Sequence, residues 1–439
     1  MINSEFLRVM SDGTVKQRHP ISGNEVWTVP GRGNRPLGIT GPAPQPVDPA
    51  EHDRLCAFCH TRYLETPPEK SRLVREGGQW RQLEGVRAEE LFDTVAEFRC
   101  IPNLFEILSY DYWHLNHGYE LDSATAARRA AYLSAPAGRE HVLAVQKGKL
   151  RISGLSDAEI EALGEKEVIS RASGFFGGGH DVVVARRHLV DGATDTSQLA
   201  SAGTLTVEEH RQYTRFTISA LQRLLETIPR ARHVAVFQNW LKPAGASFDH
   251  LHKQLVAIDE YGGSNQRALT REIQQPGMFN TRVMQPAIHH HLVLAQNDHA
   301  IAIAGFGHRY PTIKVLSTSP VCDPWLMDPI EVDGMSDLVH ALHAATGADV
   351  ASNEEWHQRP HRVGIPLPWY INIKWRVSTL AGFEGGTKIN VNTISPTALK
   401  DLLIPRLREL RDRNIVSVGL IGDECRISQH PLRYSRPQG

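Results

Sequence analysis

The spacing of apolar and polar positions predicts a mixture of helices and short strands. An apolar stripe at helical spacing runs from Tyr213 to Ile228, behind the capping box Thr206-Val-Glu-Glu209, and Pro229 ends it. Two apolar runs of strand length follow at 234–237 and 255–258. A strand is also expected at 181–185, before the helix. This order of elements predicts a sheet covered by a helix, an α+β plan.

The C-terminal part of the sequence repeats this pattern. Its predicted strands cover residues 290–295, 300–304, 313–316 and 369–375. A helix is expected over 333–345, and a last helix runs from the N-cap Ser395 and Pro396 to about residue 413. The two halves therefore resemble a duplicated unit.

The run Gly262-Gly263-Ser264-Asn265 is the best boundary between the halves, which predicts a domain at 1–262 and another at 263–439. Residues 88–172 are expected to be mainly helical, with Ala-rich and charged stretches.

Composition excludes several classes of protein. Lys and Arg total 48 against 49 Asp and Glu, so no basic bias favours nucleic acid or acidic membranes. No apolar run approaches the roughly 20 residues that span a bilayer, and the N-terminus lacks a signal-peptide core. Five cysteines are too few and too scattered for a disulfide framework. We expect a soluble cytoplasmic protein.

The stretch from Asn239 to Gln254 carries the strongest chemical signal. On an extended backbone His250, His252 and Gln254 share one face, and the residues between them share the other. One imidazole could bind a metal or be held in place while the next attacks an electrophile. Two alternate histidines on a strand are, however, more often packed or solvated than catalytic.

Cys56-Ala-Phe-Cys59 is either half of a zinc site or a redox pair. A proline-containing loop follows it, where a redox motif needs a thioredoxin-like strand and helix, so zinc is favoured. No second Cys-x-x-Cys occurs, and two histidines must then complete the site.

Residues 30–36 read Pro-Gly-Arg-Gly-Asn-Arg-Pro, in which Arg32 and Arg35 are forked donors suited to phosphate. An ordinary basic surface loop is the alternative interpretation, and for this stretch alone the more frequent one.

Together these segments resemble the galactose-1-phosphate uridylyltransferase-like family of the histidine-triad (HIT) superfamily. The resemblance covers most of both halves. It rests on five motifs in the family's order: residues 18–36, the Cys56-x-x-Cys59 loop with 66–69, the strand from His180 to His188, the segment 239–254, and the pair Phe383-Glu384.

The resemblance implies one structural zinc ion on Cys56, Cys59, His188 and His250, a closed Cys₂His₂ site. It further implies that His252 is a nucleophile that attacks the α-phosphorus of a nucleotide to give a nucleotidyl-histidine. The implied substrate-binding residues are Arg32, Arg35, Asn239, Gly245, Ser247 and, for the sugar, Glu384.

Gln254 narrows the expected reaction. Histidine-triad hydrolases carry a third histidine at this position, and a glutamine cannot donate a proton as an imidazolium does. We therefore expect transfer of a nucleoside monophosphate from a nucleoside-diphosphate sugar to a sugar 1-phosphate. The alternatives are a phosphorylase that uses inorganic phosphate on such a sugar or on a dinucleoside polyphosphate, and a non-catalytic zinc-stabilised nucleotide-binding protein. The expected partners are small molecules, with neither nucleic acid nor membrane, and a homodimer is consistent with the family.

Overall fold

The computed structural model describes residues 5–31, 43–378 and 381–435. In these residues the strands form one sheet of 12 strands and one of four. Neighbouring strands of the large sheet are antiparallel throughout, and helices cover it, which confirms the α+β class. In spatial order its strands are β16 (Leu420–Ile421), β10 (Val293–Gln296), β11 (Ala300–Gly305), β12 (Thr312–Ser317), β14 (Tyr370–Trp375), β13 (Ser352–His357), β8 (His233–Trp240), β9 (His252–Ile258), β7 (His180–Ala185), β6 (Ala96–Pro102), β4 (Ser71–Glu76) and β5 (Gln79–Glu84).

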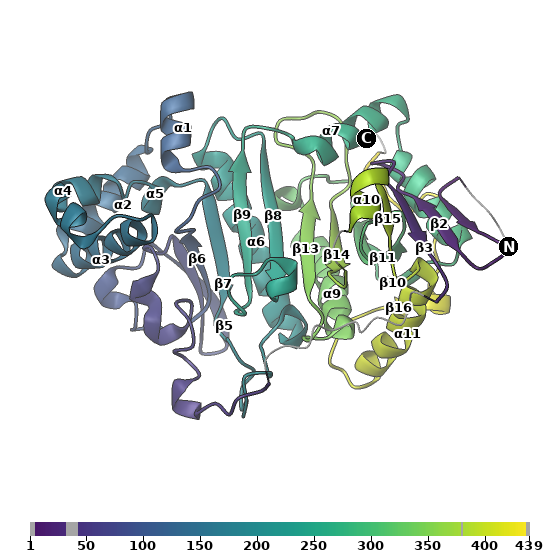
Figure 1. Ribbon diagram of the computed structural model, residues 1–439, viewed down its shortest axis with the longest axis horizontal. Coiled ribbons are helices and arrows are strands. Elements are labelled where there is room, and N and C mark those ends of the chain that lie inside the picture. Colours follow the sequence, from purple (N-terminus) through teal and green to yellow (C-terminus); the bar gives the residue numbers. More distant parts are fainter. Residues whose placement is uncertain (1–4, 32–42, 379–380, 436–439) are drawn as a thin grey trace.

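The large sheet has the same order of elements on both sides of its centre (Figure 1). Strands β6-β7-β9-β8 lie on one side, with helix α6 (Val207–Thr227) between β7 and β8 in sequence. Strands β11-β12-β14-β13 lie on the other, with α9 (Pro329–Thr346) between β12 and β13. The two sets meet where β8 pairs with β13, for example at Asn239 opposite Asn353.

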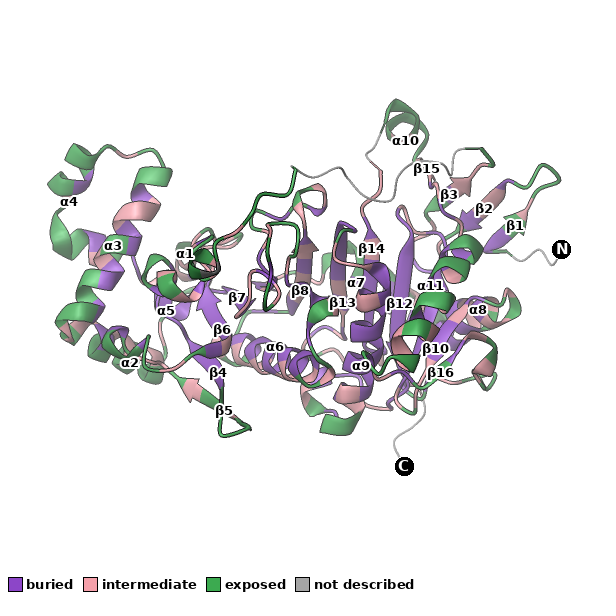
Figure 2. Cartoon of the chain, turned by 90° about the horizontal axis from the view of Figure 1, so that it is seen from below, coloured by how far each residue is buried: buried purple, intermediate pink, exposed green. Residues whose placement is uncertain are grey.

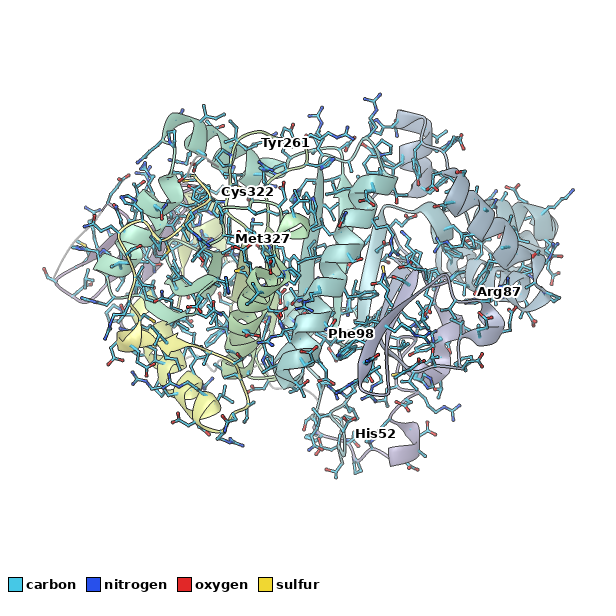
Figure 3. All side chains as sticks on the ribbon, turned by 180° about the vertical axis from the view of Figure 1, so that it is seen from behind. His52, Arg87, Phe98, Tyr261, Cys322 and Met327 are labelled. Carbon is cyan, nitrogen blue, oxygen red and sulfur yellow. The ribbon has the colours of Figure 1, made fainter. Side chains whose placement is uncertain are left out.

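Helices α6 and α9 cover the same face of the sheet (Figures 2 and 3). Helix α6 begins at the predicted capping box, because the Thr206 side chain accepts from the Glu209 N–H while the Glu209 carboxylate accepts from the Thr206 N–H. Its apolar stripe packs on the sheet, where Tyr213 stacks on Phe98 of β6 at 5.0 Å. The predicted helix is confirmed.

A buried polar cluster joins the two halves on this helix-covered side. The Lys253 ammonium of β9 lies 2.6 Å from the Glu354 carboxylate of β13, and both side chains are 1% exposed. His343 of α9 lies 2.7 Å from the other Glu354 oxygen. Charges removed from water must be paired, so this cluster fixes how β9, β13 and α9 pack together.

Residues 88–172, which were expected to be mainly helical, include a strand near their start. Residues 96–102, expected to be helical, form the buried strand β6 between β4 and β7. Helices follow it and project from one end of the sheet (Figure 2). They are α1 (Tyr110–His117), α2 (Ser123–Ser134), α3 (Pro136–Ile152), α4 (Asp157–Ser170) and the short α5 (Gly174–Gly177).

The four-stranded sheet joins the N-terminus to the C-terminal half. It consists of β1 (Leu7–Val9), β2 (Val15–Arg18), β3 (Glu25–Thr28) and β15 (Ile389–Val391), the last two parallel. Residues 5–29 therefore pack on elements that follow β9 in sequence, and Arg271 donates to the Ile21 carbonyl at 2.6 Å.

Most elements predicted for the C-terminal half are present. Strands β11, β12 and β14 match their predicted ranges to within one residue, whereas helix α9 begins earlier than predicted, at Pro329. Strand β10 begins at Val293 rather than at residue 290, because a helix extends to His289. The remaining helices are α7 (Gly262–Gln274), α8 (Gln285–His289), α10 (Gly382–Thr387) and α11 (Pro396–Asp412). Among the described helices, none is both long and apolar enough to cross a membrane.

Candidate active site

Four predicted metal ligands converge at the end of β7 and the start of β9. The ligand atoms of Cys56, Cys59, His188 and His250 all lie within 4.8 Å of one another. Cys56 Sγ is 3.4 Å from Nδ1 of both His188 and His250, and 3.8 Å from Cys59 Sγ. Cys59 Sγ is 3.7 and 3.8 Å from the same two nitrogens. Residues from three separate parts of the sequence thus form one cluster.

The spacing of the cluster fits a tetrahedral zinc ion. Zn–S bonds of about 2.3 Å and Zn–N bonds of about 2.0 Å place two sulfurs about 3.8 Å apart and a sulfur and a nitrogen about 3.5 Å apart. The His250 ring is also set for coordination through Nδ1, because its Nε2–H donates to the Ala185 carbonyl at 2.7 Å. A hydrogen bond from Cys56, and then His188 and His250, lower the pKa of the Cys59 thiol against the opposing effect of burial. The donor set therefore fits the expected metal.

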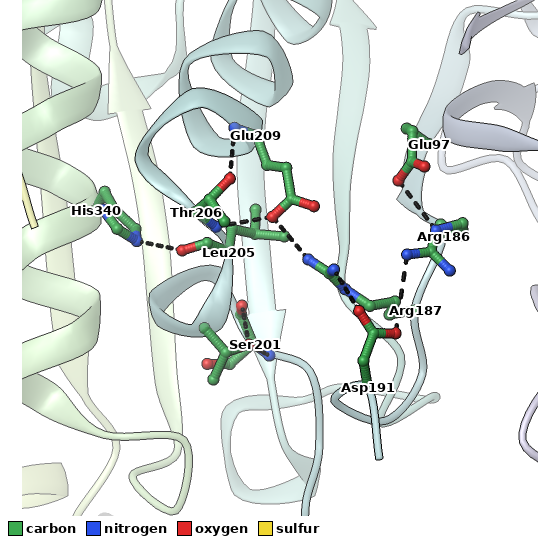
Figure 4. A network of polar contacts seen from close by, with 10 residues as sticks. Glu97, Arg186, Arg187, Asp191, Ser201, Leu205, Thr206, Glu209 and His340 are labelled. Atoms are coloured by element: carbon green, nitrogen blue, oxygen red, sulfur yellow. Dashed lines mark hydrogen bonds and ion pairs between the residues drawn. The ribbon is translucent and has the colours of Figure 1, made fainter. Parts of the chain in front are cut away.

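A network of ion pairs holds the loop that carries His188 (Figure 4). Arg186 contacts Glu97 at 3.0 Å. Arg187 contacts Glu209 of α6 at 2.7 Å and Asp191 at 3.0 Å. The two residues before His188 are thereby fixed to β6 and to the first turn of α6, which limits the positions that the imidazole can take.

His252 is the first residue of β9 and lies beside this cluster. Its Nδ1 is 2.7 Å from the His250 carbonyl oxygen, so Nδ1 carries the proton and Nε2 keeps its lone pair. The side chain is 5% exposed, and burial lowers its pKa to about 4, which keeps the ring neutral near pH 7. Phe58, between the two cysteines, lies with its ring 5.3 Å from that of His252. A neutral ring with a free Nε2 is the form that a nucleophile requires.

Gln254 is held by two residues to which the sequence assigned no role. Ile107 N–H donates to His180 Nδ1 at 3.2 Å, so His180 Nε2 carries the proton and donates to Gln254 Oε1 at 3.0 Å. Asn103 Nδ2 donates to the same oxygen at 3.4 Å. With Oε1 occupied, the Gln254 amide nitrogen stays available as a donor. His180 could have been found from the sequence, because it is a polar residue at the start of an otherwise apolar strand, whereas no local pattern singles out Asn103.

The end of β8 and the turn between β8 and His250 contain the other predicted phosphate contacts. Asn239 Oδ1 accepts from Asn353 Nδ2 at 2.7 Å, and a Cβ on Gly245 would come within 3.8 Å of the Asn239 amide nitrogen. Gly245 has φ +89°, a conformation that favours glycine, and Ser247 beyond it is exposed. The turn therefore presents a short polar loop on the same chain segment as His252.

The remaining predicted site residues are two arginines and Glu384. Arg32 and Arg35 lie outside the described residues. Glu384 lies on α10, where its carboxylate accepts from the Ala381 N–H at 3.1 Å, and the ring of the adjacent Phe383 is 6.2 Å from that of Trp27. Helix α10 therefore lies beside β15 and β3 of the four-stranded sheet (Figures 1 and 2).

An apolar floor lies on the same face of the sheet as His252. Ile101, Val182 and Val184 form a small buried cluster, against which the half-buried Phe58 packs. Val182 is paired in register with Gln254, and Val184 with His252. The side chains of His252 and Gln254 thus border an apolar surface, an arrangement common in small-molecule sites.

Comparison with solved structures identifies the class of fold. An ADP-glucose phosphorylase from Arabidopsis thaliana, solved with bound ADP-glucose, matches with a TM-score of 0.55 and 18% identity over 90% of this chain and 98% of that one. A galactose-1-phosphate uridylyltransferase-like (GalT-like) protein from the same plant matches with a TM-score of 0.54 and 17% identity over 92% and 99%. The chain therefore has the same fold as these two proteins, the GalT-like fold that the motifs predict.

A protein-family model also matches the sequence. It covers residues 10–434 and is described as "Domain of unknown function (DUF4921)", and the chain belongs to that family. A comparison with curated proteins found no match.

Proposed function

We propose that this protein is a nucleotidyltransferase that moves a nucleoside monophosphate from a nucleoside-diphosphate sugar to a phosphate-bearing acceptor through His252. The observation that carries the proposal is the hydrogen bond from His252 Nδ1 to the His250 carbonyl oxygen at 2.7 Å. It fixes the tautomer in which Nε2 is the nucleophilic atom. The GalT-like fold, in which one solved relative is named as an ADP-glucose phosphorylase, supports the same class of reaction.

The reaction has two displacement steps. The lone pair of His252 Nε2 attacks the α-phosphorus, and the phosphorus–oxygen bond to the sugar phosphate breaks, with its electrons leaving on the sugar phosphate. A phosphate oxygen of the acceptor then attacks the same phosphorus. The phosphorus–nitrogen bond breaks, the electrons return to Nε2, and His252 is again neutral. Because its pKa is about 4, His252 needs no prior deprotonation near neutral pH.

Gln254 would stabilise the phosphoryl oxygens in both steps. Its Oε1 accepts from His180 and Asn103, so its amide N–H groups can donate to the phosphoryl group. An amide has no acidic proton to give to a leaving imidazole, which favours an intermediate that persists until an acceptor phosphate binds.

A bound zinc ion would give structural rigidity to this site. Cys56, Cys59, His188 and His250 would hold it, and as four protein ligands they would leave no open coordination position. The chain's own residues position the nucleophile. The His250 carbonyl accepts from His252, and the Cys56–Cys59 turn holds Phe58 beside the His252 ring.

The phosphate groups would be bound by the turn after β8 and by the N-terminal arginines. We assign Asn239 at the end of β8, and Gly245 and Ser247 in the turn, to phosphate binding. We assign Arg32 and Arg35 to charge neutralisation. Glu384 would bind sugar hydroxyls. Among the described residues, Glu384 on α10 has no contact with His252 or Gln254. We therefore propose that it completes the site of a second copy in a homodimer.

The internal repeat is part of the proposal. The matching strand orders around α6 and α9 support a duplication in which 1–262 carries the catalytic half and 263–439 contributes to substrate binding. Only the first half kept the paired histidines, because β14 reads Tyr-Ile-Asn-Ile-Lys-Trp.

A phosphorylase is the second candidate, favoured by the name of the relative that matches 98% of its own length. In that case inorganic phosphate, rather than a sugar 1-phosphate, accepts the nucleotide. The first half-reaction at His252 is the same for both candidates.

The test is a panel of donors and acceptors with the purified full-length protein. ADP-glucose, UDP-glucose, UDP-galactose and diadenosine tetraphosphate serve as donors, each with inorganic phosphate, glucose 1-phosphate or galactose 1-phosphate as acceptor. We expect turnover that requires an acceptor and is lost in His252→Ala. Turnover with phosphate alone selects the phosphorylase, and tight nucleotide binding without turnover for any acceptor would contradict both candidates.

A further inference from the structure

A second polar cavity lies on the C-terminal half of the large sheet, and we name it the C-terminal pocket. It has a volume of about 320 Å³ and is lined by residues of β12, β13 and β14 together with the segments around His19 and His308. Its charged lining is strongly unbalanced, with one carboxylate, Glu355, against the cations Arg267, Arg309, Lys314, Lys374 and Arg376. Such an excess of positive charge in a concave site favours an anion.

Lys314 is the most unusual residue of this lining. Its side chain is on β12, and the residue is only 2% exposed. Its ammonium lies 3.8 Å from the centre of the Tyr370 ring, and within the described residues no carboxylate pairs with it. Glu355, the nearby acid, is already paired with Lys374 at 2.5 Å. Burial, and then the positive charge of Lys374, lower the pKa of Lys314 well below its ordinary value, because both disfavour the charged ammonium. A bound anion would offset this effect by stabilising the positive charge.

Within the part of the chain that the structure describes, two buried polar atoms of the lining have no hydrogen-bond partner. They are Oδ1 of Asn372 and Nε of Arg376. Nearly all buried polar groups in native proteins are hydrogen-bonded, so unpaired groups gathered in one cavity indicate a ligand. Arg376 uses its Nη1 to donate to Asn353 at 2.7 Å, which fixes the guanidinium at the side of the pocket.

The strand register relates this pocket to the His252 site. On β7 and β9, Val184 is paired with His252, and on β12 and β14, Lys314 is paired with Asn372. When the two halves are matched through their equivalent strand orders and through Trp240 and Trp356, Asn372 takes the place of His252.

The two sites lie on the same face of the sheet. Gln254, Phe237, Glu355 and Asn372 form one cross-strand row. Three spacings of about 4.8 Å put the pocket about 14 Å from Gln254. Asn353 lines the pocket and also donates to Asn239 and, at 2.8 Å, to the Ala244 carbonyl of the turn before His250.

We propose that the C-terminal pocket is a second, non-covalent anion site that binds a phosphate-bearing small molecule. Lys314, Lys374 and Arg376 supply charge and donors, of the kinds that bind phosphate in proteins. His19 adds a further donor, because its Nδ1 accepts from the Ser22 N–H at 2.9 Å and its proton is therefore on Nε2.

The volume of the C-terminal pocket suits a small molecule rather than a polymer. Without a histidine in the place of His252, the pocket binds its ligand without forming a bond to it. The proposal does not depend on the activity of His252.

Calorimetry on the full-length protein tests this site with two probes, inorganic phosphate and glucose 1-phosphate. All variants carry His252→Ala, so that no turnover occurs. We expect Lys314→Met to remove a binding event or weaken it by at least about tenfold, because one buried charge-assisted contact is lost. Lys166→Met, on the exposed side of α4, is the matched control and leaves binding unchanged. Tighter binding of glucose 1-phosphate assigns a phosphate monoester to the pocket, and equal binding assigns inorganic phosphate.

Crystals soaked in sodium tungstate locate the anion directly. An anomalous peak beside Lys314 and Arg376 supports the proposal. If Lys314→Met does not fold, Arg309→Gln at the half-buried rim should still weaken phosphate binding several-fold. Unchanged affinities in both variants, or tungstate bound only elsewhere, would overturn it.

Discussion

His252 donates from Nδ1 to the backbone carbonyl of His250, two residues earlier, at 2.7 Å. His250 in turn directs its own Nδ1 to Cys56 and Cys59 while its Nε2 donates to Ala185. The backbone of a predicted metal ligand thus determines the tautomer of the predicted nucleophile. Metal binding and catalysis become separable predictions, because His250 is the predicted metal ligand and His252 the predicted nucleophile.

Zinc content follows from the ligand cluster. Protein prepared without chelators should contain about one zinc ion per chain, and Cys56→Ser should lose most of it, because a tetrahedral site needs all four ligands. Metal analysis by mass spectrometry measures both. Cys425→Ser, outside the cluster, is the matched control and should keep its zinc. Zinc-free wild-type protein would refute the ligand set.

His180 should act by orienting Gln254. His180→Phe removes the donor to Gln254 Oε1, and we expect kcat to fall about tenfold to a hundredfold with little change in the KM of the donor nucleotide, since a donor to the phosphoryl group is misdirected. In a Gln254→Ala background the same substitution should have almost no further effect on kcat. Additive losses in the double variant would show that His180 acts independently of Gln254.

Stability should decrease as the solution is acidified below about pH 6.5. Burial lowers the pKa of His180 and of His233 to about 4 in the folded protein, so the unfolded chain binds protons that the folded chain does not. Between pH 6.5 and 4 this difference lowers the free energy of unfolding, by about 2 kcal/mol per histidine at pH 5.

Urea unfolding at pH 7.5 and pH 5.0 measures this loss. His233→Leu should reduce the difference between the two pH values, and the exposed His430→Gln serves as the control. An unchanged difference in His233→Leu would exclude His233 as a source.

Glu384 should complete the site of a second copy. His252→Ala and Glu384→Gln are each expected to be nearly inactive alone. After subunit exchange, about a quarter of the wild-type activity should return, because half of the dimers are mixed and each mixed dimer has one intact site. Activity assays after mixing and mild dissociation measure this recovery. No recovery in confirmed mixed dimers would place Glu384 in its own chain's site, or in none.

Local pattern was sufficient for much of the fold. The capping box at Thr206 and the apolar stripe behind it predict α6 to within a residue at each end, because both signals are contained in the helix itself. The alternation of His250, Leu251, His252 and Lys253 likewise predicts which side chains share a face: Phe58 contacts both histidine rings, while Lys253 lies over Tyr213 on the other side.

What the sequence could not predict depends on residues that are distant in the chain. A glutamate on a strand is expected to be exposed, yet Glu354 is buried, where it pairs with Lys253, 101 residues away in the sequence. The link from Asn103 to Gln254 spans 151 residues. Strand β13 and the central pairing of β8 with β13 have no local apolar signature, since β13 reads Ser-Asn-Glu-Glu-Trp-His.

The central claim is that His252 becomes covalently nucleotidylated. The full-length protein is incubated with ADP-glucose and, separately, UDP-glucose, each labelled at the α-phosphorus, without an acceptor. Peptides are then mapped by mass spectrometry under alkaline conditions that preserve a phosphorus–nitrogen bond. We predict acid-labile label on His252 that is released by a phosphate-bearing acceptor and is absent in His252→Ala. Label on another residue, or turnover in His252→Ala, would contradict the mechanism.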